Sequence, residues 1–213
     1  MSDDHDIAPQ LAHWRGEFGH RYQERNAPTP GNLASLTKMW ARMLRATTGA
    51  PPRSILEVGA NIGLNLRVLP RLTQAMLYAV EPNAKARKRL VADAVIPPEN
   101  VFDGWAAKLP LPDCAVDLVF TCGVLIHIAP EDLAASCREI DRVAARYVLC
   151  IEYFADRERM IEYHGQSNQL FLRDYGQFWL DTCAHLSLVD YGFFWKGAGC
   201  IDNLTWWLFV KSS

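Results

Sequence analysis

Three acidic residues stand at or near the ends of short apolar runs, where their carboxylates could bind a polar or cationic ligand. Glu57 lies in the run 54–59, Glu81 closes the run 75–81, and Asp103 lies in a short run at 100–104. If the runs are parallel strands, their carboxyl ends meet at one edge of a sheet, where the ligands of α/β folds bind. The three carboxylates therefore predict one binding site, built from residues far apart in the sequence.

The segment from Glu57 to Gly63 has the composition of a tight ligand-binding turn. Gly59 would let the backbone turn against a ligand, and Gly63 would let the following helix approach the sheet. Asn61 and Leu64 interrupt the glycine spacing of a G-x-G-x-x-G fingerprint, so a pyrophosphate cradle is poorly supported. The pattern E-x-G-x-N-x-G instead resembles the loop that binds S-adenosylmethionine (SAM), with Glu57 facing the cationic amino end of the methionine directly or through water.

The other two carboxylates suit the nucleoside part of SAM. Glu81 could accept hydrogen bonds from both ribose hydroxyls, and Pro82 then ends the strand. Asp103 could accept a hydrogen bond from the adenine amino group, while Trp105 or a small residue covers the ring. We therefore predict a cofactor site made of Glu57, Gly59, Ala60, Asn61, Gly63, Glu81, Pro82, Asp103, Gly104, Trp105, Cys122 and Gly123.

The segment 121–128 follows the fourth predicted strand, where the sulfonium of the methyl donor is expected. It contains no Asp/Asn-Pro-Pro-aromatic motif, the usual signature of amino-base methylation in DNA. His127 could serve as a general base near neutral pH. The alternative is that His127 packs near the cofactor or donates to a backbone carbonyl. Glu152 and His164 are the other candidates for the base, and a thioether acceptor would need none.

The elements that must position these residues alternate between strands and helices from residue 54 onward, which is typical of a doubly wound α/β sheet. Two long β-rich runs without a helix between them end the chain, and they favour an antiparallel hairpin. Consecutive residues of a strand face opposite sides, so Trp206 and Trp207 should point in opposite directions. The predicted fold is a Rossmann-like class I methyltransferase with a mostly parallel seven-stranded sheet that ends in this hairpin. The predicted helices are 9–26, 31–48, 63–72, 83–93, 130–143 and 173–184, and the strands are 54–59, 75–81, 100–104, 116–122, 147–154, 186–195 and 204–211.

The segments outside this alternation should cover the acceptor. Residues 1–50 read as a tail and a helical cap, residues 51–213 as the SAM-binding domain, and residues 155–172 as an insertion over the sheet edge. Trp14, Tyr22 and Arg25 would share one face of a single helix, either closing over the acceptor or anchoring the helix to the core. The predicted acceptor site comprises Trp14, Tyr22, Arg25, Asn26, Tyr153, Tyr163 and Arg173, beside His127, Glu152 and His164.

Composition narrows the class of partner. The 213 residues carry a formal net charge of −2, and Lys and Arg are spread along the chain, which disfavours nucleic acid. Six cysteines without a C-x-x-C pair argue against a zinc site or a disulfide framework. No apolar run reaches the length of a membrane span. We expect a cytoplasmic protein that binds no metal, and the oligomeric state stays open.

Most of the chain resembles the pseudaminic acid biosynthesis-associated methylase family. The opening motif Trp14-x-Gly16-x-Phe18-Gly19-x-x-Tyr22-x-x-Arg25-Asn26 is similar to that of the family, and LEVGANIGLNL at 56–66 is similar to its SAM loop. The similarity continues through the segments 123–131, 151–153, 170–174 and 188–193. The resemblance implies a SAM-dependent methyltransferase, and the link of the family to sugar acids is an association.

Two departures from the family bear on the acceptor. Where the family tends to have Tyr-Arg-Gly and Lys-Arg-Asp, this chain has Tyr163-His164-Gly165 and Leu172-Arg173-Asp174. The loss of two cationic positions weakens the case for a strongly anionic acceptor and favours a smaller or zwitterionic metabolite. The predicted function is methyl transfer from SAM to a small polar molecule. The alternatives are an NAD(P)-dependent oxidoreductase and a catalytically silent SAM-binding partner of another protein.

Overall fold

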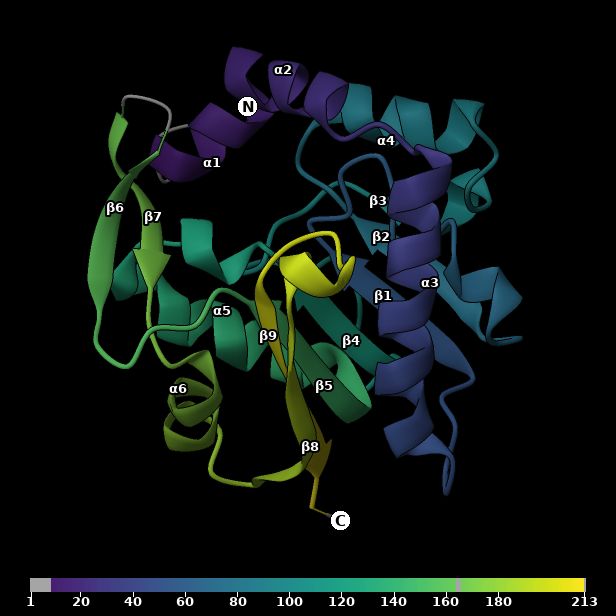
Figure 1. Cartoon of the computed structure of the whole chain (residues 1–213), viewed down its shortest axis with the longest axis vertical. Coiled ribbons are helices and arrows are strands. Elements are labelled where there is room, and N and C mark those ends of the chain that lie inside the picture. The colour runs from purple at the N-terminus through teal and green to yellow at the C-terminus, as the bar shows by residue number, and fades with distance from the viewer. Residues whose placement is uncertain (1–8, 164–165, 213) are drawn as a thin grey trace.

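A single seven-stranded sheet forms the centre of the computed structural model, which describes residues 9–163 and 166–212 (Figure 1). The strand order is β3-β2-β1-β4-β5-β9-β8. Neighbouring strands from β3 to β5 pair in parallel, whereas β9 runs antiparallel to both β5 and β8. The predicted fold class, including the final antiparallel hairpin, is confirmed. The strands are β1 (Ser54–Val58), β2 (Met76–Val80), β3 (Val101–Phe102), β4 (Val116–Cys122), β5 (Ala144–Glu152), β8 (Leu186–Phe194) and β9 (Leu204–Lys211).

Helices cover the sheet and its upper edge in Figure 1. The α-helices are α1 (Pro9–Arg15), α2 (Glu17–Arg25), α3 (Pro30–Leu44), α4 (Ala84–Ala92), α5 (Pro130–Val143) and α6 (Tyr175–Thr182). Short 3-10 helices are η1 (Arg45–Thr47), η2 (Leu69–Arg71), η3 (Pro98–Asn100), η4 (Leu125–His127) and η5 (Lys196–Ala198). Among the described residues, no helix combines the length and apolar composition that crossing a bilayer requires.

The two faces of the sheet belong to separate apolar cores, because neighbouring strand residues point in opposite directions. Ile55 packs with the core that contains the buried residues of α3, while Leu56 packs with the core that contains those of α5 and α6. Trp206 and Trp207 divide between the same two cores, and both are buried, as the alternation predicts. Glu57 follows Leu56 and therefore faces the side of α3.

The predicted helix 9–26 is two helices, and this corrects the sequence-based interpretation. Gly16 separates α1 from α2 with an extended backbone (φ −88°, ψ −157°), which is consistent with the weak helix propensity of glycine. Trp14 and Tyr22 therefore do not lie on one helix. Their rings still meet, with centroids 5.1 Å apart in an edge-to-face arrangement.

Two further segments differ from the prediction. No α-helix forms at 63–72; the backbone makes turns from Gly63, whose φ is +72°, and ends in η2, where Pro70 lacks a donor N–H. Within the predicted insertion 155–172, β6 (Arg159–Tyr163) and β7 (Gln166–Leu172) pair antiparallel as a second small sheet. The weak periodicity of this segment concealed its strands.

The pair α1 and α2 lies over the upper edge of the sheet in Figure 1, close to α4. Asn83, the N-cap of α4, accepts from the N–H groups of Lys85 and Ala86. The side chain of Asn83 also donates to the carbonyl of Trp14 at 2.9 Å and accepts from Gln23 at 3.0 Å. One cap residue therefore fixes α4 and attaches α1 and α2 to the end of β2.

Candidate active site

A cavity of about 660 Å³ opens where the ends of the parallel strands meet the N-terminal helices. Most of the residues predicted from the sequence contribute to its wall, from both the cofactor set and the acceptor set. The predicted residues that line it are Trp14, Tyr22, Asn26, Glu57, Gly59, Ala60, Asn61, Glu81, Pro82, Trp105, Cys122, Gly123, His127 and Tyr153. The tertiary structure thus brings together segments separated by more than 100 residues.

The turn after β1 is held tightly against β2. The N–H groups of Gly59 and Ala60 both donate to the carbonyl of Val80, at 2.8 and 3.2 Å. Gly59 has a φ of +74°, and a Cβ at this position would lie 2.6 Å from a methyl group of Val124. Glycine is therefore required at position 59 for both its conformation and its size.

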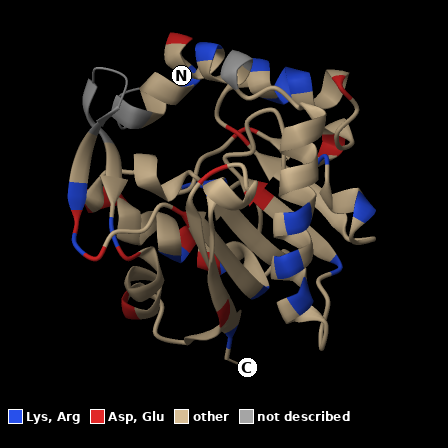
Figure 2. Ribbon diagram, viewed as in Figure 1, with Lys and Arg blue, Asp and Glu red and all other residues tan. Residues whose placement is uncertain are grey.

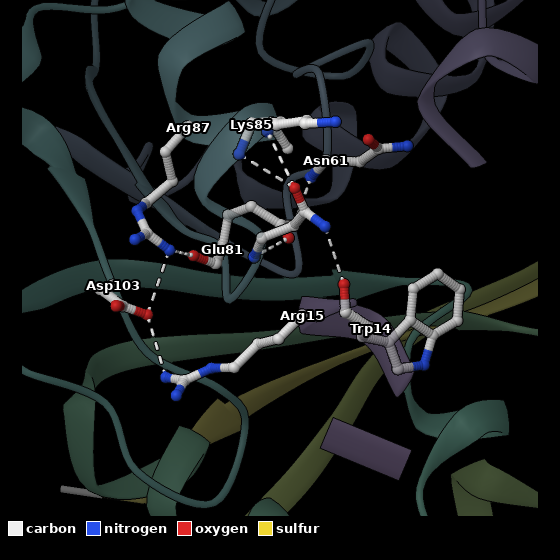
Figure 3. Close-up of polar contacts among 9 residues, drawn as sticks. Trp14, Arg15, Asn61, Glu81, Lys85, Arg87 and Asp103 are labelled. Carbon is white, nitrogen blue, oxygen red and sulfur yellow. Dashed lines mark hydrogen bonds and ion pairs between the residues drawn. The ribbon is translucent and has the colours of Figure 1, made fainter. Parts of the chain in front are cut away.

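Glu81 connects the two loops beside the cavity. One carboxylate oxygen accepts from the N–H of Asn61 and the other from the N–H of Asn83, each at 2.7 Å (Figure 3). A carboxylate has about four acceptor sites, so each oxygen keeps one for a ligand. Burial raises the pKa of Glu81 to about 7, and the two backbone hydrogen bonds oppose this rise.

Glu57 is buried in the wall of the cavity and is only 3% exposed. Its Oε1 accepts from the side-chain amide of Asn65 at 2.6 Å, while its Oε2 is buried without a hydrogen-bond partner. Burial raises the pKa of Glu57 to about 8 against the lowering effect of the Asn65 hydrogen bond, and Glu81 adds to the rise. A cationic ligand that reached this oxygen would favour the ionised form.

Asp103 lies at the edge of the site and half exposed, with its carboxylate between two arginines. Arg15 of α1 and Arg87 of α4 each approach the same oxygen at 3.1 Å (Figure 3). Asp103, Gly104 and Gly63 are not among the described residues that line the cavity. The adenine role of Asp103 stays a prediction, and in this structure its partners are cations of the protein. Trp105 does line the cavity, with the Arg15 guanidinium 5.3 Å from its ring centroid.

His127 lies on the cap side of the cavity and is 6% exposed. Its ring makes an edge contact with Trp14, with centroids 4.9 Å apart. Trp14 also contacts Phe18 and Tyr22. The candidate base thus adjoins an aromatic cluster supplied by α1 and α2.

Glu152 holds the loop after β4 instead of lining the cavity. It is fully buried, and its Oε1 accepts from the N–H groups of Val124 and Leu125, both at 3.1 Å. These contacts position the segment that leads to His127. The neighbouring Tyr153 does line the cavity, and its hydroxyl donates to Asp202 at 2.6 Å.

The remaining predicted acceptor residues divide into two groups. Arg173 is buried away from the cavity wall, 3.2 Å from Glu158, with its guanidinium 5.2 Å from the ring centroid of Phe178. The side chains of Arg25 and Tyr163 lie outside the described part of the structure, as does all of His164. The predicted roles of these three residues stay predictions.

Sequence reasoning missed several polar residues of the cavity wall. They are Asn32, Asn65, Asn83, Asp132, Ser136 and Asp202. Asn83 had a signal, because it follows a strand-ending proline and precedes a helical pattern, where N-caps occur. Asn65 had no signal from its spacing, since it stands eight residues after Glu57 in a segment predicted to be a helix, although it lies within the segment 56–66 that resembles the SAM loop of the family.

Comparisons with known proteins agree with this geometry. Residues 56–159 match the Methyltransferase domain family. No curated protein shows significant sequence similarity to the chain.

Many solved structures are similar to this chain, and three of them are methyltransferases matched over most of both chains. The 1,6-didemethyltoxoflavin-N1-methyltransferase of Burkholderia thailandensis, with its acceptor and S-adenosylhomocysteine bound, is 16% identical, has a TM-score of 0.71, and is matched over 100% of this chain and 94% of that chain. The magnesium protoporphyrin IX methyltransferase of Synechocystis with bound SAM is 14% identical (TM-score 0.69; 98% and 100% covered). A SAM-dependent methyltransferase of Leishmania major is also 14% identical (TM-score 0.72; 95% and 87% covered). The domain match over residues 56–159 and the fold shared with these structures support a SAM-dependent methyltransferase with the class I fold.

Proposed function

We propose that this chain transfers the methyl group of SAM to a small polar acceptor bound between the sheet edge and the N-terminal helices. The observation that carries the proposal is the buried, unpartnered oxygen of Glu57 in a cavity that Trp14, Tyr22 and Trp105 also line. A cavity of about 660 Å³ falls within the range of about 300–1,000 Å³ that small-molecule sites occupy.

The residues present fit the cofactor. The carboxylate of Glu57 complements the ammonium of the methionine end, and Glu81 retains acceptor sites for the ribose hydroxyls. Trp105 offers a ring at the adenine end. When bound, SAM supplies an electrophilic methyl group on a sulfonium. The protein must then align the acceptor atom with it and exclude water.

The acceptor side supports a polar molecule that is not strongly anionic. Trp14 and Tyr22 supply aromatic surface, and His127 is the proposed base for an acceptor hydroxyl or ammonium. Asp132 and Asp202 add negative charge, while no Lys or Arg lines the cavity among the side chains that the structure describes. The toxoflavin and porphyrin methyltransferases of similar fold also act on small molecules. A sugar-acid acceptor, suggested by the family resemblance, fits this charge less well than a neutral or zwitterionic one.

The surface charge supports the same choice of partner. Figure 2 shows Lys and Arg on several separate elements, with Asp and Glu between them. We therefore propose a small molecule as the partner, in preference to nucleic acid or a membrane. All six cysteines are free, which suits the reducing cytoplasm as the proposed location.

Transfer of a radioactive methyl group from SAM to the small-molecule fraction of a cell extract tests the proposal. We expect label to appear in a product of low molecular mass, together with one equivalent of S-adenosylhomocysteine. Label that appears only in protein or nucleic acid would overturn the proposed acceptor class. SAM binding without any transfer would instead favour the silent-partner alternative, and binding of NADH in place of SAM would favour the oxidoreductase.

A further inference from the structure

A chain of buried hydrogen bonds connects α3 to the cavity. The indole Nε1 of Trp40 donates to Oδ1 of Asn65 at 3.0 Å, and Nδ2 of Asn65 donates to Oε1 of Glu57 at 2.6 Å. The exposed fractions are 0% for Trp40, 7% for Asn65 and 3% for Glu57. Both hydrogen bonds of this Trp40–Asn65–Glu57 relay are therefore shielded from water. If either bond were broken, water could not replace it without a cost in free energy.

The chemistry of the two ends fixes the orientation of the amide between them. The indole nitrogen of Trp40 can only donate, and an ionised Glu57 carboxylate can only accept. Asn65 must therefore direct its oxygen to the indole and its NH2 group to the carboxylate. A flipped amide would place donor against donor and acceptor against acceptor, and both buried contacts would be lost.

This orientation determines what Glu57 offers to a ligand. The short hydrogen bond from Asn65 occupies one oxygen of Glu57 and favours the charged carboxylate over the neutral acid. The second oxygen is left buried and without a partner in the wall of the cavity. Without Asn65, burial would raise the pKa of Glu57 further, and the protonated acid attracts an ammonium group far less.

We propose that Asn65 is a positioning residue for the cofactor, which donates to Oε1 of Glu57 and leaves the second oxygen of Glu57 for the ammonium of SAM. Trp40 in turn fixes the orientation of Asn65. This inference rests on the proposed contact between Glu57 and the methionine end. The inference gives α3 a role in cofactor binding, through Trp40. The buried residues of this helix otherwise pack against the sheet as part of the core.

Two ligands that differ only at the methionine end separate this role from a general structural one. SAM carries the amino acid, whereas 5′-methylthioadenosine retains the adenine and ribose and lacks it. For Asn65→Leu we expect calorimetry at pH 7.5 to show SAM affinity reduced roughly 10- to 100-fold, the range for a hydrogen bond to a charged group. The affinity for 5′-methylthioadenosine should stay within about twofold, since its contacts do not involve Glu57.

A second variant and a pH series keep the inference testable even if Asn65→Leu disturbs folding. Trp40→Phe keeps an aromatic ring in the core and removes the indole N–H; we expect SAM affinity to fall roughly 3- to 10-fold. In Asn65→Leu, the rise of SAM affinity with pH should also move to higher pH, because the carboxyl loses its supporting hydrogen bond.

Asn100→Leu is the matched control. It removes a different partly buried hydrogen bond, which the side-chain amide of Asn100 donates to the carbonyl of Leu77 at 3.0 Å. Neither residue is among those that line the cavity. This control should leave both affinities unchanged. Equal weakening of both ligands by Asn65→Leu, or weakening of neither, would overturn the inference. A wild-type protein that binds 5′-methylthioadenosine as tightly as SAM would contradict the proposed role of Glu57 itself.

Discussion

The two sides of the cavity are built in different ways. On the proposed cofactor side, Glu57 and Glu81 stand at or near strand ends, and side-chain or backbone N–H groups hold their oxygens at 2.6–2.7 Å. On the proposed acceptor side, Trp14 and Tyr22 come from two short helices, and the Trp14 ring contacts the rings of Tyr22 and His127. The cofactor side is thus fixed by sheet topology and hydrogen bonds, and the acceptor side by segments added to the sheet.

The difference shows how one fold can keep a cofactor and change its acceptor. Strand ends and tight turns have little freedom, because their backbone groups are already paired. Helices and hairpins outside the sheet can change in sequence and length while the cofactor contacts remain. The two sides are still physically connected, because Asn83, just after β2, donates a hydrogen bond to the carbonyl of Trp14.

The largest expected effect concerns chemistry on the acceptor side. Replacement of His127 by Asn keeps hydrogen-bonding capacity and removes the titratable group, so kcat should fall roughly 10²- to 10⁴-fold if His127 is the base. SAM affinity should change little, because Glu57 and Glu81 remain intact. The pH–rate profile should also lose its acidic limb. A fall of less than about fivefold with that limb retained would exclude His127 as the essential base.

A loss confined to binding is expected on the cofactor side. Glu81→Ala should weaken SAM binding by about 1.5–3 kcal/mol, the range for hydrogen bonds to charged groups. Unlike Asn65→Leu, it should weaken 5′-methylthioadenosine to a similar extent, because Glu81 is assigned to the ribose. Glu99→Ala changes an exposed glutamate and serves as the control. Unchanged SAM affinity in a calorimetric titration of folded Glu81→Ala would refute the ribose assignment.

The cofactor side should also respond to pH. Since the pKa of Glu57 is raised to about 8, the carboxyl is largely protonated at pH 6 in the free protein and must lose its proton to bind an ammonium. SAM affinity should therefore rise roughly tenfold between pH 6 and pH 7 and level off above pH 8. Calorimetry in buffers of different ionisation enthalpy should detect proton release. The same slope in Glu57→Gln would assign the effect to another group.

Stability of the free protein should change with pH in the opposite sense. The pKa of Glu57 is higher in the folded protein than its ordinary value of 4.5, so the folded state binds more protons between about pH 4.5 and 8. This group therefore makes the free energy of unfolding fall as pH rises through that window. Saturating SAM should remove the Glu57 part of the decrease, which thermal melting with and without the ligand can measure. Glu152, whose pKa burial raises to about 7, keeps its own contribution.

The smallest effect is expected at the boundary between the two sides. The ion pairs of Asp103 with Arg15 and Arg87 are partly exposed, and such pairs contribute about 0–1 kcal/mol. Salt in the buffer weakens such exposed ion pairs further. Asp103→Asn should therefore change SAM affinity by less than about threefold. A loss of tenfold or more would instead support the sequence-based assignment of Asp103 to the adenine.

The sequence by itself determined the sheet and most of the cofactor side. Apolar runs bounded by Gly and Pro located the strands, and β4, α5 and β9 have the predicted bounds. Glu57, Gly59 and Glu81 were recognisable because a strand end is a local feature, and parallel strand ends converge by topology. The alternation of Trp206 and Trp207 followed from the period of two in a strand.

Only the tertiary structure decided which side chains face the cavity and what their partners are. Glu152 looked like a candidate base, yet its carboxylate is buried against backbone N–H groups of the loop after β4. Asp103 is engaged by arginines from two helices, a contact that depends on how α1 lies over the sheet. Asn65 became visible only through Trp40 and Glu57, because a hydrogen-bond relay between distant segments leaves no periodic signal in the chain. The positions of strands can be predicted because they follow from local patterns of apolar and polar residues. The contacts of a side chain in the site depend on how distant segments pack together, and no local pattern in the sequence records that packing.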